Sequence, residues 1–153
     1  MTTTTAMPST ETTLIMKRTL AVSRERVFDA WTTPAQLKQW FFASDEYISP
    51  LAEVDLKVGG RFRMAMKHAT KAKEHVATGL YREIKRPEKL VFSWEWEGEP
   101  ENGQTVVTVE LRDVSGATEM MFKQEFFPNK GRRDEHEGGW TGCFENLAKH
   151  VQS

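Results

Sequence analysis

The sequence has little cysteine, little net charge and no long apolar run, and each of these excludes a class of protein. Its 153 residues include one cysteine, Cys143, so no disulfide can form within the chain. Its 21 basic and 22 acidic residues almost cancel and are scattered, which argues against binding to nucleic acid or to an anionic membrane surface. No apolar segment approaches the roughly 20 residues that a membrane-spanning helix needs. We therefore expect a cytoplasmic protein with no membrane span and no nucleic-acid partner.

The first residues do not resemble a signal peptide. Residues 1–13 are rich in threonine and have neither a basic start nor an apolar run. We expect a disordered tail over residues 1–12 and a single domain over residues 13–153. A chain of this size can bury about 68–70% of its unfolded surface, so a sizeable core is available.

The C-terminal stretch predicts one long amphipathic helix from Asp134 to Val151. Its apolar residues recur at helical spacing and form one stripe: Trp140, Phe144, Leu147 and Val151. Asp134 and Glu137 resemble a capping box at the start. Gly138, Gly139 and Gly142 each cost about 1 kcal/mol relative to alanine inside a helix, so close approach of another backbone or of a ligand is one explanation for them. The alternative is a helix that begins one turn later, with Gly138 and Gly139 in a loop.

The N-terminal third predicts a strand and then two short helices. Residues 14–22 alternate so that Leu14, Met16 and Leu20 share a face. Ser23 suits the N-cap of a helix that carries Val27, Phe28 and Trp31. A second helix begins at Thr33, with Pro34 at its first position and Gln36 closing a capping box. It carries Leu37, Trp40 and Phe41.

The middle of the chain predicts about six further strands joined by turns. Residues 47–58 are extended and broken by Pro50, and Gly59–Gly60 forms the turn into a strictly alternating strand. Alternation places these side chains on the inward faces of four strands: Phe62, Met64, Met66 and His68; Leu90, Phe92, Trp94 and Trp96; Val107, Val109 and Leu111; and Met120, Phe122, Gln124 and Phe126. Ser93, Glu95 and Glu97 are expected on the outer face. The strand over residues 75–85 is apolar on both faces, which leaves Tyr81 unassigned.

This order of elements predicts an α+β fold. Strands joined by short turns can form a strongly curved antiparallel sheet, with the two short helices inserted after the first strand and the long C-terminal helix packed on the concave face. A helix of 18 residues is about 27 Å long, close to the roughly 30 Å of a nine-residue strand. The helix and the sheet therefore match in length.

Four motifs carry a family resemblance: VFDAWTTP (27–34) with Leu37 and Trp40, VGGRF (58–62), PEKLVFSW (87–94), and HEGGW (136–140) followed by Leu147. They resemble the bacterial proteins related to the activator of the heat-shock-protein-90 ATPase, of the START-like or birch-pollen-allergen-like superfamily (SRPBCC). The resemblance implies a helix-grip fold that encloses an apolar cavity. It leaves the function open, because this fold carries lipid carriers, polyketide cyclases, hormone receptors and chaperone regulators.

The predicted interior is rich in bulky, flexible groups that suit a ligand cavity. Methionine repacks around ligands, and tryptophan offers a flat wall with an N–H group. Three polar side chains, His68, Gln124 and Thr78, fall in phase with the inward apolar residues of their strands and could orient a ligand's polar atoms. The alternatives are plain core packing for the apolar groups, and core hydrogen bonds or rim positions for the polar ones. We expect the ligand-binding residues to be Met64, Met66, His68, Trp94, Trp96, Gln124, Phe126, Trp140 and Phe144.

Metal and nucleophile chemistry find little support in the motifs. His136–Glu137 begins like a zinc-protease motif, but Trp140 stands where the second histidine ligand is required. Cys143 has no neighbouring base in the sequence, and Gly59–Gly60 lacks the spacing of a phosphate-binding loop. We expect no metal, no cofactor and no catalytic residue.

Three functional hypotheses follow. The first is binding of a small hydrophobic or amphipathic molecule between the C-terminal helix and the sheet. The second, implied by the resemblance, is a protein-interaction module that contacts a chaperone. The third is a cyclase-like or hydrolase-like enzyme that uses His68 with Gln124 or a cavity carboxylate. The sequence leaves open whether the protein is a monomer or a homodimer.

Overall fold

The computed structural model describes residues 10–153, so residues 1–9 of the expected tail lie outside the described part. An eight-stranded sheet and three α-helices make up the fold. In chain order the elements are β1 (Thr13–Leu20), α1 (Arg24–Thr32), α2 (Pro34–Trp40), β2 (Tyr47–Ile48), β3 (Ala52–Val54), β4 (Arg61–His68), β5 (Glu74–Lys85), β6 (Lys89–Trp96), a 3-10 turn (Pro100–Asn102), β7 (Thr105–Val114), β8 (Ala117–Glu125) and α3 (Lys130–Gln152).

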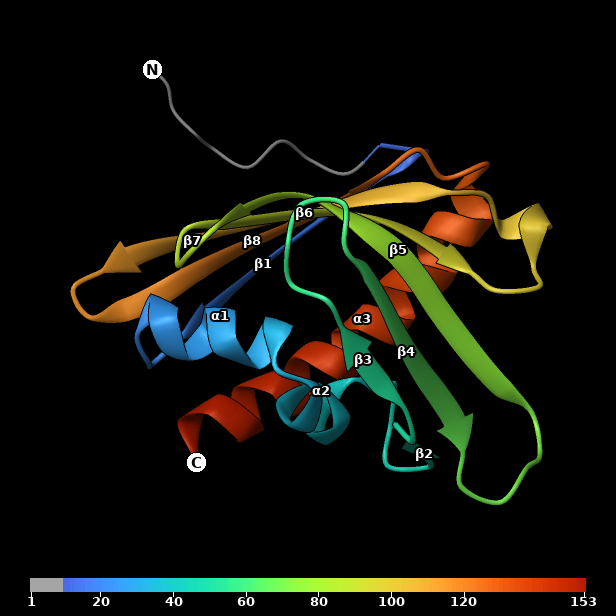
Figure 1. Cartoon of the computed structure of the whole chain (residues 1–153), viewed down its shortest axis with the longest axis horizontal. Helices are drawn as coiled ribbons and strands as arrows, with labels where there is room; N and C mark the ends of the chain where they lie inside the picture. Colours follow the sequence, from blue (N-terminus) through green and yellow to red (C-terminus); the bar gives the residue numbers. More distant parts are fainter. Residues whose placement is uncertain (1–9) are drawn as a thin grey trace.

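The strands form one antiparallel sheet in the order β1-β8-β7-β6-β5-β4-β2, and β3 also pairs with β4. Consecutive strands from β4 to β8 are neighbours, whereas β1 closes against β8 at the far end of the chain. All three helices lie on the concave side of this curved sheet, and α3 runs diagonally beneath it (Figure 1). The predicted α+β helix-grip architecture is confirmed.

The helix starts follow the sequence rules in part. Ser23 caps α1, and its hydroxyl accepts a hydrogen bond from the Arg26 backbone N–H at 3.2 Å. The prediction of a capping box at the start of α2 is wrong. The Thr33 side chain makes no capping bond, and the Gln36 side chain instead accepts a bond from the Arg26 guanidinium at 2.7 Å. Pro34 does occupy the first turn of α2, as expected.

α3 begins a turn earlier than the sequence predicts. Its N-cap is Asn129, whose side-chain oxygen accepts a bond from the Arg132 backbone N–H at 2.9 Å, so Asp134 and Glu137 form no capping box. The helix continues without a break through Gly138 and Gly139, which excludes the alternative of a loop there. A Cβ on either glycine would meet no atom within 4 Å.

Gly142 is the glycine that close packing requires. A Cβ built on it would lie 1.7 Å from the carbonyl oxygen of Ala43, in the loop between α2 and β2. The same loop is held to α3 by Asn146, whose side-chain N–H donates to the Phe42 carbonyl at 2.9 Å. The close approach of another backbone, one explanation for the glycine-rich helix start, is therefore confirmed for Gly142 alone.

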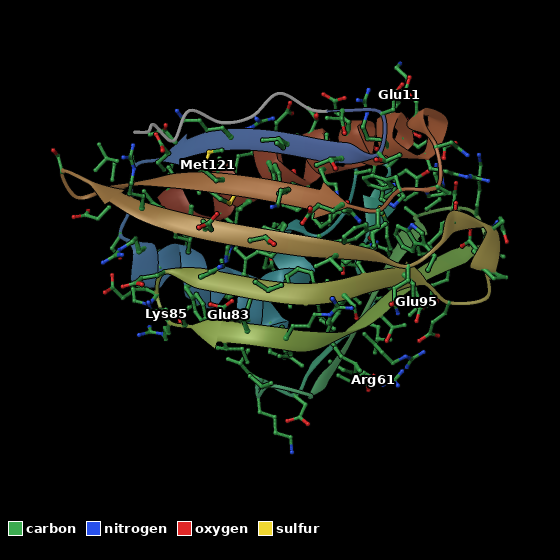
Figure 2. The ribbon with its side chains drawn as sticks, turned by 90° about the horizontal axis from the view of Figure 1, so that it is seen from above. Glu11, Arg61, Glu83, Lys85, Glu95 and Met121 are labelled. Carbon is green, nitrogen blue, oxygen red and sulfur yellow. The ribbon has the colours of Figure 1, made fainter. Side chains whose placement is uncertain are left out.

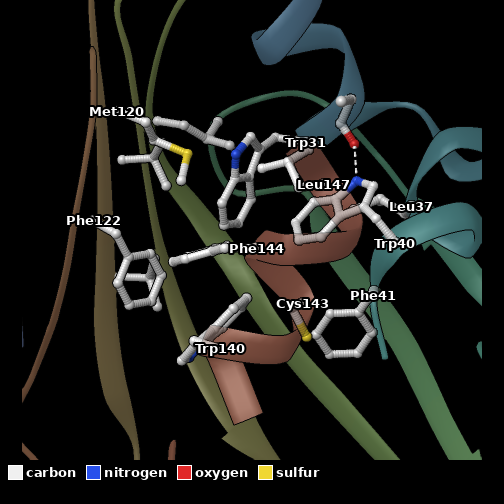
Figure 3. Packing of buried hydrophobic residues seen from close by; sticks show 14 of the residues in the cluster. Trp31, Leu37, Trp40, Phe41, Met120, Phe122, Trp140, Cys143, Phe144 and Leu147 are labelled. Carbon is white, nitrogen blue, oxygen red and sulfur yellow. Dashed lines mark hydrogen bonds between the residues drawn. The ribbon is translucent and has the colours of Figure 1, made fainter. Parts of the chain in front are cut away.

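The core lies between α3, the two short helices and the concave face of the sheet (Figure 3). Trp31 of α1 packs between Trp40, Phe122 and Phe144, with ring centroids 4.8, 6.3 and 6.1 Å away. The Trp40 indole N–H donates to the Ala30 carbonyl at 2.9 Å, which fixes α2 against α1. Each such fully buried large side chain contributes on the order of 2 kcal/mol through removal of apolar surface from water.

The sheet register assigns the strand faces, including that of Tyr81. Tyr81 is buried, with its ring 5.7 Å from that of Phe62. Glu95 and Glu97 are exposed on the outer face, which carries many charged side chains (Figure 2). Ser93, expected on the same outer face, is buried: its hydroxyl accepts a bond from the Leu80 N–H at 2.9 Å, and the Gly79 backbone lies against its carbonyl. The β5–β6 register shifts just beyond this contact, between Tyr81 and Glu83.

Candidate functional site

A cavity of about 440 Å³ opens where α3 passes over the ends of β4, β5 and β6. Its volume lies within the range of small-molecule sites. Its lining comes from α3, from the sheet, from the α2–β2 loop and from the residues around the 3-10 turn: Phe41, Ala43, Tyr47, Met66, His75, Trp94, Trp96, Glu99, Asn102, Arg132, Glu135, His136, Gly139, Trp140 and Cys143.

Three indole rings and Phe41 form the apolar wall. Trp94 is at the centre of this group, with ring centroids 5.2 Å from Trp140, 5.6 Å from Trp96 and 5.7 Å from Phe41. The Trp94 and Trp96 rings stand at 83° to each other, and Trp94 is only 1% exposed because its neighbours cover it. The β6 alternation places both side chains on the same face of the sheet, because residues two apart on a strand project from the same face.

The other end of the cavity is polar, and its charged groups are paired. The Glu99 carboxylate lies 3.3 Å from His75 Nδ1 and accepts a bond from the Asn102 side chain at 3.0 Å. The Arg132 guanidinium donates to Glu135 at 3.1 Å, one turn apart on α3. With the His75 imidazole neutral, the two carboxylates and one guanidinium give this end an acidic balance.

His136 joins the polar end to the aromatic wall. Its Nε2 accepts a bond from the Trp96 indole N–H at 3.0 Å, so its Nδ1 carries the proton and donates to the Arg132 carbonyl at 2.8 Å. This arrangement requires a neutral ring. Burial lowers the pKa of His136 below its ordinary value, which favours the same neutral form.

The three cavity indoles differ in how their N–H groups are satisfied. The Trp140 N–H donates to Gln124 Oε1 at 2.9 Å, and the Trp96 N–H donates to His136. The Trp94 N–H is buried and has no hydrogen-bond partner among residues 10–153. Leaving such a donor without a partner costs about 1–3 kcal/mol, which makes Trp94 the exceptional polar group of the site.

The structure gathers four of the nine predicted binding residues at this cavity: Met66, Trp94, Trp96 and Trp140. Met64 and Phe144 are buried in the core and do not line it. Gln124 lies beneath the wall, where it accepts from Trp140 and donates to Thr105 Oγ1 at 2.8 Å. Gln124 therefore orients an indole ring from behind.

Phe126 is placed wrongly by the alternation. Its side chain is 65% exposed, while that of Phe127 is 3% exposed. β8 ends at Glu125, and Phe126 has a backbone φ of 73°, so the period-two pattern stops one residue before it. Phe127 occupies the buried position, with its ring 4.9 Å from that of His136.

His68 and Thr78 are not among the cavity-lining residues. His68 ends β4, where its Nε2 lies 3.2 Å from the Glu46 carboxylate and its ring packs against Tyr47. Thr78 is opposite Glu95 in the sheet register, on the outer face, and its hydroxyl donates to the Phe62 carbonyl at 2.9 Å. The expectation that Thr78 is in phase with inward residues is therefore wrong.

Sequence reasoning missed most of the polar lining. The sequence motif around His136 indicates only an incomplete zinc site, but the position of His136 one turn before Trp140 on the same helix is a signal that places it at the cavity. Glu99 and Asn102 lie in a loop whose conformation no periodicity predicts. Cys143 also lines the cavity, and burial raises the pKa of its thiol to about 12, so it is protonated at neutral pH.

Comparisons with known proteins identify the family. Residues 21–152 match the family described as "Activator of Hsp90 ATPase homolog 1-like protein". The chain belongs to this family. A comparison with curated proteins found no match.

Several solved structures resemble this member of the Activator of Hsp90 ATPase homolog 1-like family. One from Chromobacterium violaceum is 23% identical with a TM-score of 0.85, over 93% of this chain and 98% of that one. An AHSA1-like protein from Aeromonas hydrophila is 23% identical with a TM-score of 0.77, over 92% of both chains. The AHSA1 protein from Silicibacter pomeroyi is 21% identical with a TM-score of 0.79, over 92% of this chain and 97% of that one. Identities this low show a shared fold.

The described residues contain neither a cluster of metal ligands nor a helix that could span a membrane. Among the described residues, no three histidine, cysteine or acidic side chains are grouped so that they could hold a metal ion. Within the same part of the chain, no helix has the length and apolar character needed to cross a membrane.

Proposed function

We propose that the protein binds a small hydrophobic or amphipathic molecule in the cavity between α3 and the sheet. The observation that carries the proposal is the wall of Phe41, Trp94, Trp96 and Trp140 around a space of about 440 Å³. Apolar walls with a few placed polar groups are typical of small-molecule sites. Met66, which is unbranched and flexible, lines the same space and can adjust to the shape of an occupant.

Gly139 offers a way to block this cavity without disturbing the core. It lines the cavity from α3, and a Cβ added to it would meet no atom within 4 Å. Gly138, its neighbour, has the same open surroundings but does not line the cavity. Both substitutions remove a glycine from a helix interior, which favours the helix. Gly139→Leu is therefore the blocking variant and Gly138→Leu its matched control.

The test is native against denaturing mass spectrometry of freshly purified protein. A reproducible excess mass should appear in the native spectrum, disappear on denaturation, and be absent from Gly139→Leu but present in Gly138→Leu. Such a result would identify the ligand class directly. If no excess mass appears, and apolar probes bind both variants equally, the cavity is not the binding site and the proposal fails.

A second candidate function is a protein-interaction module that contacts a chaperone. It is favoured by the family description and by three exposed apolar side chains, Leu56, Val58 and Leu80. These lie on neighbouring segments, since the Gly59 N–H donates to the Tyr81 carbonyl at 2.8 Å. A pull-down with purified chaperone should lose signal in the variant Val58→Ser with Leu80→Ser and keep it in Gly139→Leu.

The enzyme hypothesis gains nothing from the geometry. It joined His68 to Gln124 or to a cavity carboxylate. His68 lies outside the cavity that Glu99 and Glu135 line. Gln124 is on β8, separated from β4 by β5, β6 and β7 in the sheet, and it does not line the cavity either.

A further inference from the structure

The charged groups at the cavity point away from an anionic ligand. Glu99 and Glu135 line it with a single guanidinium, Arg132, which is already bonded to Glu135. His136 is neutral, with both ring nitrogens in hydrogen bonds to Trp96 and Arg132. A carboxylate or phosphate entering this cavity would therefore lose its hydration and lie near two carboxylates, while the described lining residues offer it no unpaired cation. Burying an unpaired charge is costly.

The buried donor at Trp94 points to an acceptor on the ligand. Its N–H has no partner in the described chain, whereas the N–H groups of both neighbouring indoles are bonded to Gln124 and His136. The nitrogen is closed off from solvent, so an occupant reaches it only by shifting a wall side chain. Phe41 and Met66 line the same cavity, and methionine changes rotamer easily. A carbonyl or ether oxygen placed there would satisfy the orphan donor.

We infer that the cavity selects uncharged aromatic or aliphatic amphiphiles that carry a hydrogen-bond acceptor, a carbonyl oxygen above all, and that it discriminates against carboxylates. This inference rests on the proposed binding function and names its ligand class. The acceptor oxygen meets Trp94 Nε1, the flat body lies against the indole faces, and the acidic end made by Glu99 and Glu135 excludes anions.

Three probes of nearly equal size test separately whether the ligand needs a hydrogen-bond acceptor and whether it must be uncharged. 2-Acetylnaphthalene has a neutral acceptor, 2-ethylnaphthalene has none, and 2-naphthoate is an anion at pH 7.5. Equilibrium dialysis gives a dissociation constant for each with the full chain. Because ethyl and acetyl groups differ in hydrophobicity, the informative quantity is the ratio of their dissociation constants and how a substitution changes that ratio.

Trp94→Phe removes the N–H while it keeps an aromatic wall. It should lower the ethyl-to-acetyl ratio of dissociation constants about three- to tenfold, the worth of one neutral hydrogen bond. Trp31→Phe is the matched control, because the Trp31 indole N–H is also buried without a partner among residues 10–153, and Trp31 does not line the cavity. It should leave the ratio unchanged.

Glu99→Gln tests the charge requirement. It should tighten 2-naphthoate binding about threefold and leave 2-acetylnaphthalene unaffected, because the nearby charge acts only on a charged ligand. Glu101→Gln, an exposed residue in the same loop that does not line the cavity, is the control. Equal affinity of the wild type for naphthoate and acetylnaphthalene would overturn this part.

A measurement on the wild type guards against a Trp94→Phe variant that fails to fold. In nitrogen-15 NMR spectra, one indole N–H of the five tryptophans should move strongly with 2-acetylnaphthalene and little with 2-ethylnaphthalene. If both probes bind, Gly139→Leu blocks them, and no indole signal distinguishes them, the cavity binds ligands but the acceptor inference is wrong. If neither probe binds and the native mass spectrum shows no excess mass, the proposed function itself fails.

Discussion

The indole N–H of Trp140 donates to Gln124 Oε1 at 2.9 Å, and this bond joins the C-terminal helix to β8 beneath the cavity wall. Both groups are buried, and the amide nitrogen of Gln124 donates in turn to Thr105 Oγ1 at 2.8 Å. The Thr105 hydroxyl in turn donates to the Trp94 backbone carbonyl at 3.1 Å, which extends the hydrogen-bond network to β6. The network therefore links the Trp140 indole to the backbone of Trp94.

We expect Gln124→Met to reduce stability by about 1–3 kcal/mol. Methionine keeps the shape of the side chain, but the Trp140 N–H and the Thr105 hydroxyl each lose a buried partner. The free energy of unfolding from urea denaturation checks this. Gln104→Met changes an exposed glutamine and should have little effect. Equal stability of the two variants would show that the network is not needed for folding.

Gly142→Ala and Gly138→Ala should change stability in opposite directions. At Gly142 the added Cβ would overlap the Ala43 carbonyl, so the loop must move, at a cost of about 1–3 kcal/mol that outweighs the gain in helix propensity. At Gly138 the Cβ enters open space, and the helix should gain roughly 0.5–1 kcal/mol. Urea denaturation of both variants in one buffer measures the difference, and a gain at Gly142 would contradict the close packing.

The neighbouring phenylalanines after β8 make a third prediction. Phe127→Ala should cost about 3–5 kcal/mol, because a buried ring is lost from contact with His136. Phe126→Ala, at an exposed position, should change the unfolding free energy by less than about 0.5 kcal/mol. Thermal unfolding followed by circular dichroism distinguishes the two, and a reversed order would restore the strand alternation that the sequence suggested.

Acidification should weaken the fold through His136. Burial lowers the pKa of this ring in the folded protein below its ordinary value of 6.5, so the unfolded chain binds more protons as the pH falls. The unfolding free energy should decline below about pH 6.5, by at most about 1.4 kcal/mol per pH unit for this group. His136→Gln should show a smaller loss between pH 7 and pH 5 than the wild type.

A second histidine contributes to the same pH window and has to be separated from the first. Burial and the Arg26 guanidinium lower the pKa of His150, whose Nε2 lies 3.0 Å from Gln36 Oε1. His150→Gln therefore reduces the acid loss independently, and the two effects should add because the residues lie almost four turns apart on α3. An unchanged pH slope in His136→Gln would contradict the neutral, buried ring.

The fold was predictable because local signals agreed along the chain. The alternation of Leu90, Phe92, Trp94 and Trp96 and the stripe of Trp140, Phe144, Leu147 and Val151 identified the two faces that form the core. The predicted element boundaries were wrong at two places. Phe126 adopts a positive φ after β8, and Asn129, not Asp134, caps the last helix. Such ends depend on single backbone angles that periodicity does not record.

The candidate site was predictable only where it is part of a regular element. Trp94, Trp96 and Met66 follow from strand alternation, and Trp140 follows from the helix stripe. His68 follows the same alternation but lies where the sheet extends past the cavity. Glu99 and Asn102 enter through a loop, and their placement beside His75 depends on contacts between residues more than 20 positions apart.

The contact between Gly142 and Ala43 also bears on how the cavity can evolve. On this side, next to Cys143, the boundary is set by main chain against main chain, with no room for a further atom. A substitution there would alter the seating of the helix. The opposite side of the cavity is formed by side chains of β4, β5 and β6 and by the exposed turns of α3, which can be exchanged one at a time without moving a backbone.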